Sequence, residues 1–273
     1  MHPTLVEIGP LAIRSYGLML ALSFFLGILQ ARWRAQRAGI DPQKMMDLAV
    51  VVILASIIGS RGLYVVFHLD EFSAHPLDII NPFQSSGEVG IQGLTMYGGV
   101  ILAFLLSLWF LRRHRLPTWK VVDVVAPSIA LGVFLTRIGC FLNGCCFGKP
   151  SSLPWCVVFP EESAAGYFAT RDFYPDTCLH PTQLYSSLYG LAIFGLLLVL
   201  ERYKKFDGFT FWLFILLYAV ARFSVDFVRF YEQAMTIHPG GIEVSVNHLI
   251  SAVLFVLALF MMFHLGRRKT AAS

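Results

Sequence analysis

Seven stretches of this chain are apolar over roughly the length that a helix needs to cross a lipid bilayer, about 20 residues. Only 14% of the 273 residues are charged, and 56% are hydrophobic. Soluble domains carry about 25% charged residues, so this composition is typical of a membrane protein. We expect an all-α integral membrane protein with about seven transmembrane helices. The predicted spans are 14–32, 46–68, 94–111, 121–143, 184–200, 209–230 and 246–265.

The basic residues gather in alternate connections between these spans. Most of the 21 lysines and arginines follow the first, third and fifth spans or lie in the C-terminal tail. The opposite connections hold only Lys149 and Arg171. Cytoplasmic loops of membrane proteins are rich in Lys and Arg, so we expect the N-terminus outside and the C-terminus in the cytoplasm. The net charge of +4 follows from this bias and does not indicate nucleic-acid binding.

The connections predict one membrane-embedded domain over residues 1–273. Residues 144–183 form the longest outer connection and are rich in proline, which indicates a small extracytoplasmic head inserted into that domain. The outer connection 69–93 is rich in Pro, Ser, Gly and acidic residues. The N-terminus lacks the basic region and cleavage site of a signal peptide, so the first span is expected to remain as an anchor.

All five cysteines lie between Cys140 and Cys178, at or beyond the predicted outer face, where disulfides persist. A bridge between Cys156 and Cys178 is one reasonable pairing. No metal site is expected, because Cys140, Cys145 and Cys146 lack the usual two-residue gap between ligands. At least two of the five are expected to be small packing residues.

Arginines are unusual inside predicted spans, because each costs at least about 2.5 kcal/mol on insertion scales. The guanidinium group also presents a planar fork of donors that suits phosphate. Any single arginine could reach an interface or pair with a local acid, but several together indicate a site for an anionic group. The arginines in or at the edge of the spans are Arg14, Arg61, Arg137, Arg222 and Arg229.

The densest polar cluster is TRIGCFLNGCCFGKP at 136–150, near the outer end of the fourth span. Here Arg137 is followed by Asn143, whose amide can both donate and accept hydrogen bonds. Glycines such as Gly148 let backbone N–H groups approach a ligand closely. The combination predicts a polar binding site at this end of the span.

The end of the sixth span carries a second cluster, in which four polar residues are spaced four, four and three apart. We expect them to share one helix face. The single carboxylate can pair with either arginine, and one positive charge is then left for a phosphate. The alternative is an ion pair that only allows the helix to insert. The four residues are Tyr218, Arg222, Asp226 and Arg229.

Weaker candidates lie at other span ends, and most of them fall toward the outer leaflet. Tyr16 follows Arg14, and Tyr97 precedes two glycines. His180 and Gln183 open the fifth span, where a histidine is more often an interfacial residue or helix cap. A polar pocket with a positively charged base would suit a phospholipid headgroup. Arg61 and Tyr64 lie three residues apart, and Arg61 and Arg222 are placed somewhat deeper.

Six motifs together make the chain resemble the prolipoprotein diacylglyceryl transferase family over nearly its whole length. The resemblance implies an enzyme that moves the diacylglyceryl group of phosphatidylglycerol onto the lipobox cysteine of a prolipoprotein signal peptide. The products would be a thioether and glycerol 1-phosphate. It also implies a multi-pass protein of the bacterial inner membrane, with its site toward the outer leaflet and no cofactor. The motifs are RSYGL at 14–18, GSRGLYVVF at 59–67, GLTMYGGVI at 93–101, RIGCFLNGCCFG at 137–148, HPTQLY at 180–185 and YAVARFSVDFVR at 218–229.

The resemblance also implies roles for residues. We expect Arg137 and Arg222 to hold the phosphate and to stabilise charge on the departing glycerol phosphate, while Asp226 orients Arg222. Tyr97 completes the expected catalytic set, although its pKa is too high for an efficient base. The expected phosphatidylglycerol-binding residues are Arg137, Asn143, Gly148, Tyr16, Arg61, Tyr64, Tyr218, Arg222, Arg229, His180 and Gln183.

The chain departs from the family signature G-R-x-G-N-F-x-N-x-E-x-x-G at three positions. Thr136, Cys140 and Cys145 replace a glycine, an asparagine and a glutamate. Tyr97 replaces a histidine proposed as the base in the family's HGG motif. The group that deprotonates the substrate thiol is therefore open. Since a free thiol has a pKa of about 8.5, local positive charge could supply the thiolate.

Two other functions remain possible from the residues alone. Five cysteines at the outer face could belong to a thiol oxidoreductase, although no C-x-x-C motif is present. Five arginines could also serve a transporter of an anionic solute, although no paired repeat with broken helices is evident.

Overall fold

The computed structural model describes residues 4–8, 11–72, 76–79, 81, 93, 95–174, 176–231, 236–237 and 244–270. Seven of its helices are long and apolar enough to cross a membrane, so the predicted number of spans is confirmed. The side of the membrane on which each terminus lies remains a prediction. The seven helices are α1 (Ser15–Arg37), α2 (Pro42–Phe67), α4 (Met96–Arg113), α5 (Thr118–Asn143), α7 (Thr182–Leu200), α8 (Phe209–Asp226) and α9 (Val246–Thr270).

Short elements connect these helices. The expectation of an all-α fold missed two small antiparallel pairs, in which strands of two to five residues are too short to give a periodic pattern. In the second pair, Thr236 faces Ser245 and Ile237 faces Val244. The short elements are β1 (Thr4–Ile8), β2 (Leu11–Arg14), α3 (Leu69–Phe72), η1 (Pro76–Ile79), α6 (Ala164–Asp172), η2 (Glu201–Tyr203), β3 (Thr236–Ile237) and β4 (Val244–Ser245).

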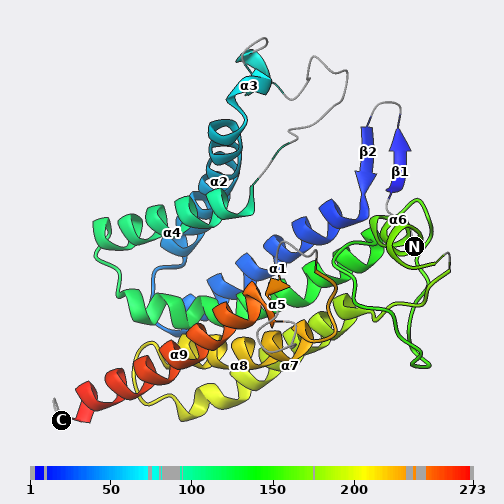
Figure 1. Ribbon diagram of the computed structural model, residues 1–273. Coiled ribbons are helices and arrows are strands. Elements are labelled where there is room, and N and C mark those ends of the chain that lie inside the picture. The colour runs from blue at the N-terminus through cyan, green and yellow to red at the C-terminus, as the bar shows by residue number, and fades with distance from the viewer. Residues whose placement is uncertain are drawn as a thin grey trace. The chain divides into compact units, whose positions relative to one another are not determined.

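The chain divides into two compact units, and the first contains Met1–Glu7, Ala12–Ala31 and Val122–Ser273. In this unit α7, α8 and α9 run side by side (Figure 1). The start of α1 packs on α5, where Ser23 Oγ donates to the Gly132 carbonyl at 3.4 Å. Pro127 lies inside α5 without interrupting the helix. A buried apolar cluster that includes Ala130, Leu197 and Phe214 joins α5, α7 and α8.

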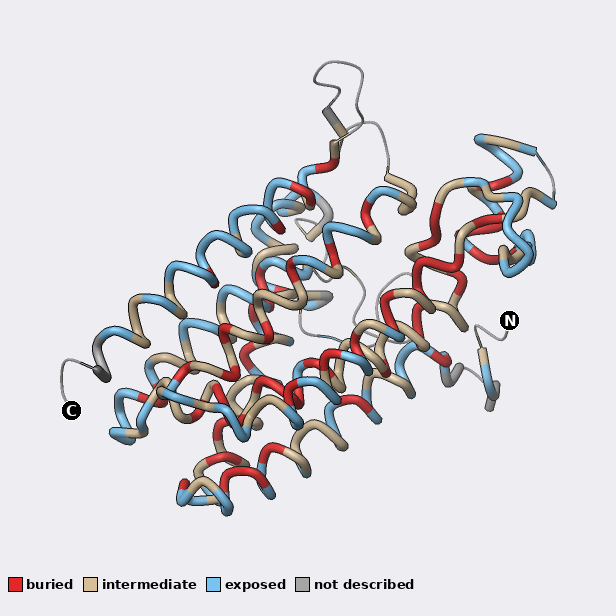
Figure 2. The backbone as a smooth tube through the Cα atoms, turned by 90° about the horizontal axis from the view of Figure 1, so that it is seen from below, coloured by how far each residue is buried: buried red, intermediate tan, exposed pale blue. Residues whose placement is uncertain are grey.

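The second unit contains Ile8–Leu11 and Arg32–Val121, and its centre is the packing of α2 against α4. A Cβ atom on Gly98 would lie 2.2 Å from the Gly59 carbonyl oxygen, so the two backbones touch where the helices meet. Small residues at such points allow membrane helices to approach closely. The helices also carry long exposed stretches (Figure 2), with large apolar side chains such as Ile58 and Phe104. These surfaces suit contact with lipid.

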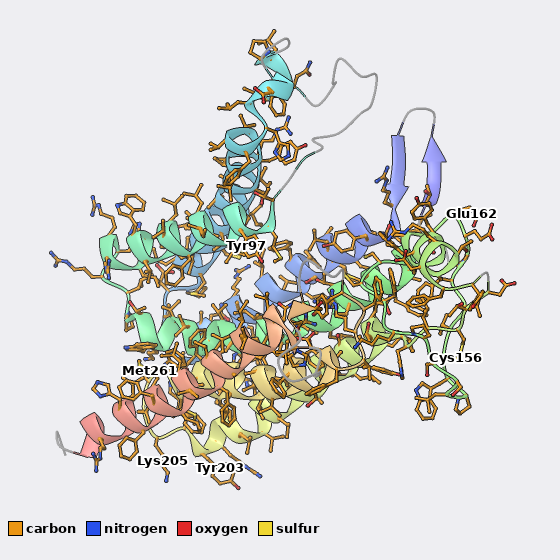
Figure 3. The ribbon with its side chains drawn as sticks, viewed as in Figure 1. Tyr97, Cys156, Glu162, Tyr203, Lys205 and Met261 are labelled. Atoms are coloured by element: carbon orange, nitrogen blue, oxygen red, sulfur yellow. A yellow bond between two sulfur atoms is a disulfide. The ribbon has the colours of Figure 1, made fainter. Side chains whose placement is uncertain are left out.

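Residues between α5 and α7 form a small folded head on the first unit. Cys156 and Cys178 form a disulfide, so this predicted pairing is confirmed (Figure 3). Closing a loop of this size stabilises the fold by about 3 kcal/mol. Backbone bridges join Leu179 to Pro150 and Val157. Phe147, Phe159, Ala165, Ala169 and Leu179 make a buried core beneath them.

Candidate active site

Arg137 lies near the C-terminal end of α5 and is half-buried. Among the residues that the structure describes, it forms no ion pair and donates no hydrogen bond. Its electrostatic neighbours are thiol and phenol groups, namely Cys140, Cys146, Tyr189 and Tyr218. A guanidinium in a membrane span costs free energy when no ion pair compensates its charge.

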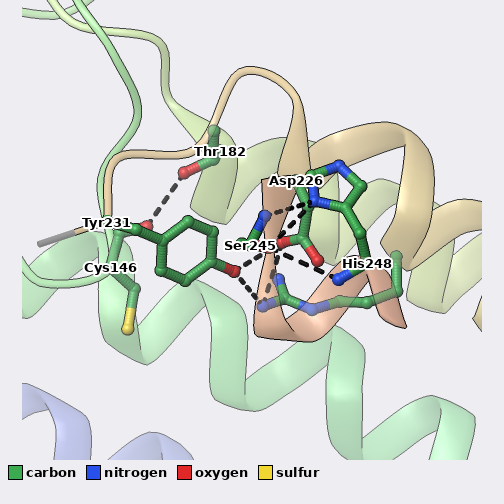
Figure 4. A network of polar contacts seen from close by, with 7 residues as sticks. Cys146, Thr182, Asp226, Tyr231, Ser245 and His248 are labelled. Atoms are coloured by element: carbon green, nitrogen blue, oxygen red, sulfur yellow. Dashed lines mark hydrogen bonds and ion pairs between the residues drawn. The ribbon is translucent and has the colours of Figure 1, made fainter. Parts of the chain in front are cut away.

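Arg222 is buried on α8, and its side-chain partners include Asp226 and Tyr231, which Figure 4 labels. One of its nitrogens, Nη2, lies 3.0 Å from Asp226 Oδ1 and donates to the Tyr231 hydroxyl at 2.5 Å. The Tyr231 hydroxyl donates to the same carboxylate oxygen at 2.6 Å. The expected pairing of Asp226 with Arg222 is confirmed. The other terminal nitrogen of Arg222, Nη1, is buried and has no hydrogen-bond partner in the described part of the chain.

Tyr231 completes this triad just beyond α8. Burial, followed by the hydrogen bond to Asp226, raises the pKa of Tyr231 to about 12. The phenol therefore stays protonated at neutral pH and donates to the carboxylate. The triad holds the Arg222 side chain in one orientation.

Arg229 does not share the helix face of Tyr218, Arg222 and Asp226, so this prediction is wrong. The helix ends at Asp226, and the next residues pair with the head instead. Lys149 N–H donates to the Val228 carbonyl at 2.8 Å, and Gly148 and Arg229 form an antiparallel bridge. Spacing along the chain could not reveal this long-range pairing. The charge of Arg229 nevertheless acts on Cys146, as does that of Arg137.

Three thiols meet at the end of α5. The Sγ atoms of Cys140, Cys145 and Cys146 all lie within 4.8 Å of one another, and none of the three is in a disulfide. The cause is the helix C-cap, in which Gly144 has a φ of +67°. Cys145 N–H donates to the Cys140 carbonyl at 3.0 Å, and Gly144 N–H donates to the Phe141 carbonyl at 3.1 Å. This pair of hydrogen bonds is a Schellman motif, which brings the side chains of Cys140 and Cys145 together.

The charge state of this cluster is set by its neighbours. Hydrogen bonds from the Cys140 and Cys145 thiols, together with the charges of Arg229 and Arg137, hold the pKa of Cys146 well below its usual range. The two guanidinium groups therefore favour the ionised form of the Cys146 thiol.

The head and the start of α7 fix the turn that carries these cysteines. Gln183 Nε2 donates to the Cys145 carbonyl at 2.8 Å, and Thr182 Oγ1 donates to the Cys146 carbonyl at 2.9 Å (Figure 4). Gly148 N–H donates to the His180 carbonyl at 3.0 Å. The structure thus gives Gln183, Gly148 and His180, which were expected to bind lipid, contacts that position the turn.

The comparison with known families decides the class. The family model of prolipoprotein diacylglyceryl transferase matches residues 3–264. The chain belongs to this family. Membership favours a transferase over the oxidoreductase and the transporter considered from the residues alone.

Relatives from distant bacteria agree, and each is named phosphatidylglycerol–prolipoprotein diacylglyceryl transferase. The protein of Trichormus variabilis is 33% identical over 235 residues, which cover 83% of this chain and 78% of the relative. That of Solidesulfovibrio magneticus is 33% identical over 265 residues, covering 95% and 93%. That of Clostridium tetani is 31% identical over 268 residues, covering 98% of both.

Within this transferase fold, two further predicted residues lie near Arg137. Tyr16 is at the start of α1 and interacts electrostatically with Arg137 and the three cysteines. Gly139 makes this approach possible, because a Cβ atom there would lie 3.0 Å from Met19 Cβ. Asn143 ends α5 and interacts with Cys145. The structure therefore brings Tyr16, Asn143 and Tyr218 to the neighbourhood of Arg137.

The predicted residues of the second unit form a cluster of their own. Arg61 is buried, and its guanidinium donates to the carbonyls of Ile79 at 3.0 Å and Gly93 at 3.3 Å. Tyr64 packs against Gly93, where a Cβ atom would lie 2.4 Å from its ring. These contacts hold the connection between α2 and α4, as far as it is described. Tyr97 opens α4 and is 68% exposed (Figure 3).

Several residues of the site carried too little signal to be found from the sequence. Tyr189 on α7 interacts electrostatically with both Arg137 and Arg222. An isolated tyrosine in an apolar span belongs to no motif that would predict this interaction. His248 is buried at the start of α9, where Ser245 Oγ lies 2.9 Å from its Nδ1 (Figure 4). The His248 ring also packs on Phe227, with centroids 4.6 Å apart. A serine three residues before a histidine could have indicated a helix cap there.

A cavity of about 260 Å³ lies elsewhere, in the head, between α6 and residues 158–161 and 176–177. None of the predicted site residues lines it. We therefore assign the chemistry to the residues around Arg137 rather than to this cavity.

Proposed function

We propose that this chain transfers the diacylglyceryl group of phosphatidylglycerol to the lipobox cysteine thiol of prolipoproteins. The reaction forms a thioether and releases glycerol 1-phosphate at the outer leaflet of the bacterial cytoplasmic membrane. Family membership supports this reaction. The observation that carries it is Arg137, a cation in a membrane span that forms no ion pair with a carboxylate among the described residues.

In this mechanism Arg137 binds the phosphate of the lipid. The buried Nη1 of Arg222 is the second donor, because Nη2 is already occupied by Asp226 and Tyr231. The two guanidinium groups stabilise the negative charge that develops on the leaving phosphate when its bond to the diacylglyceryl carbon breaks. The phenols of Tyr189 and Tyr218 lie beside Arg137 and suit the glycerol hydroxyls.

The test uses the purified full-length protein with phosphatidylglycerol and a synthetic lipobox peptide. Mass spectrometry should detect the diacylglyceryl peptide, and an identical peptide with Ser in place of Cys should gain nothing. Arg137→Ala should lower the rate by at least about 100-fold, as for loss of one donor to a developing oxyanion. Arg202→Ala is the matched control, since Arg202 lies over the Tyr203 ring on η2.

Two results would exclude this function. One is the absence of any peptide adduct with the intact, folded protein. The other is an unchanged rate in the Arg137→Ala variant, which would show that the Arg137 guanidinium takes no part in the reaction.

A further inference from the structure

The cluster of Cys140, Cys145 and Cys146 is more than a packing feature of the α5 cap. We propose that these three cysteines form a site for a thiophilic divalent cation such as Zn²⁺, with a fourth coordination position left open. Neither the family match nor the relatives' names assign a metal to the chain. Binding of the ion follows from the geometry alone, whereas its role in catalysis, given below, rests on the proposed function.

The sulfur positions fit one ion. A Zn–S bond is about 2.3 Å long, so two sulfurs of a tetrahedral site lie about 3.8 Å apart. The three Sγ atoms lie within 4.8 Å of one another without any ion present. Small rotations about the Cα–Cβ bonds are enough to bring them onto a common centre.

The backbone beneath the sulfurs is held from several directions. The Schellman cap fixes Cys140 and Cys145, and the Thr182 hydroxyl fixes the carbonyl of Cys146. Gly148 follows two residues later and packs closely against the segment after α8. A Cβ atom on Gly148 would lie 2.6 Å from the Val228 carbonyl oxygen. A frame that is constrained in this way preorganises ligands, because little conformational entropy is lost when the ion binds.

Charge and exposure also favour an ion with an open position. Three thiolates and one Zn²⁺ carry a net charge of about −1, and the guanidinium groups of Arg137 and Arg229 both act on this cluster. Cys140 is buried, whereas Cys145 and Cys146 are half-buried, so the cluster is partly exposed. Three protein ligands with one open position is the pattern of catalytic zinc sites, and structural sites use four.

Under the proposed function, the open position is where the lipobox thiol binds. A thiol that coordinates the cation loses its proton to water, so no histidine base is required. Its sulfur then attacks the diacylglyceryl carbon as the carbon–oxygen bond to phosphate breaks, and the electron pair leaves with glycerol 1-phosphate. The thioether product is a neutral and weaker ligand, and it departs from the ion. This role accounts for Cys140 and Cys145 at positions where the family signature has asparagine and glutamate.

Metal binding is tested first, without lipid or peptide. The reduced, metal-stripped full-length protein is titrated with Co²⁺, which gives thiolate charge-transfer and d–d absorption bands when bound by sulfur. We expect one Co²⁺ per chain, displaced by one Zn²⁺. Replacing Cys140, Cys145 or Cys146 singly with Ser should weaken binding by more than about 100-fold, beyond the loss typical for a residue outside the ligand set. The Cys156→Ser/Cys178→Ser double variant removes two sulfurs outside the cluster and should keep the bands.

Three outcomes would overturn the proposal: no thiolate band with Co²⁺, full binding in all three single variants, or a disulfide within the cluster of the unreduced protein by mass spectrometry. The open position is tested by adding the lipobox peptide to the Co²⁺ protein. The d–d bands should shift with the Cys peptide and not with its Ser analogue, and an unshifted spectrum would exclude the catalytic role. If the protein binds the metal but transfers no lipid, the proposed function is refuted and the metal site stands. If the metal-stripped protein transfers lipid at the full rate, the proposed function stands and the catalytic role of the metal is refuted.

Discussion

Tyr189 on α7 and Tyr218 on α8 pack edge to face, with ring centroids 5.9 Å apart. Arg137 interacts electrostatically with both phenols, and Tyr189 also interacts with Arg222. The tyrosine pair therefore connects the two arginines to which we assign the phosphate. Polar rings in a span cost less than charges, so they can line a lipid-accessible site without a counter-ion.

Arg137 should be more important for activity than for stability. Because Arg137 has no hydrogen bond or ion pair to a described residue, Arg137→Gln removes a desolvated charge and loses only electrostatic interactions with the neighbouring thiols and phenols. We expect an unchanged or higher melting temperature in detergent, together with loss of lipid transfer. A clear fall in melting temperature would show that the guanidinium has a structural partner.

Arg222 should behave in the opposite way when its partner is removed. Asp226→Asn leaves a buried guanidinium without a carboxylate, and breaking such a pair costs about 3 kcal/mol or more. We expect a lower melting temperature and a raised KM for phosphatidylglycerol. The exposed pair of Arg171 and Asp172 is the control, since Asp172→Asn should leave the melting temperature nearly unchanged.

The length of the apolar stretches was enough to predict all seven spans, because a bilayer sets the number of residues in each. The Cys156–Cys178 disulfide was also foreseen. Arg229 was misplaced because pairing with Gly148, far away in the sequence, ends α8 at Asp226. Such pairing leaves no periodic trace.

The functional cluster was only partly visible from the sequence. The argument from ligand spacing missed the thiol cluster, because it assumed ligands two residues apart and ignored the cap geometry around Gly144. Arg61 was expected to bind phosphatidylglycerol, and the structure shows its guanidinium donating to the carbonyls of Ile79 and Gly93. Composition alone cannot distinguish an arginine that donates hydrogen bonds to backbone carbonyls from one that binds a ligand.

The high pKa of Tyr231 predicts a specific alkaline instability. Its pKa is about 12 in the folded protein, against about 10 for an unperturbed tyrosine. The folded state therefore favours the protonated phenol, and the resulting stability is complete below pH 10 and is lost as the pH rises toward 12. By linkage the free energy of unfolding therefore falls over this pH range. Unfolding at several pH values should show this loss in the wild type and not in Tyr231→Phe, and parallel curves for the two would contradict it.

Gly148 should tolerate no side chain. A Cβ atom there would lie 2.6 Å from both the Val228 carbonyl oxygen and His180 Cβ, and neither group is the end of a flexible chain. We expect Gly148→Ala to destabilise the protein by about 1–3 kcal/mol and to displace the turn that carries Cys146. The melting temperature and the affinity for Co²⁺ should both fall in this variant. Gly195→Ala on α7 is the matched control: it meets nothing within 4 Å and should stabilise its helix by about 0.5–1 kcal/mol. Equal effects of the two substitutions would show that the close approach at Gly148 does not constrain the site.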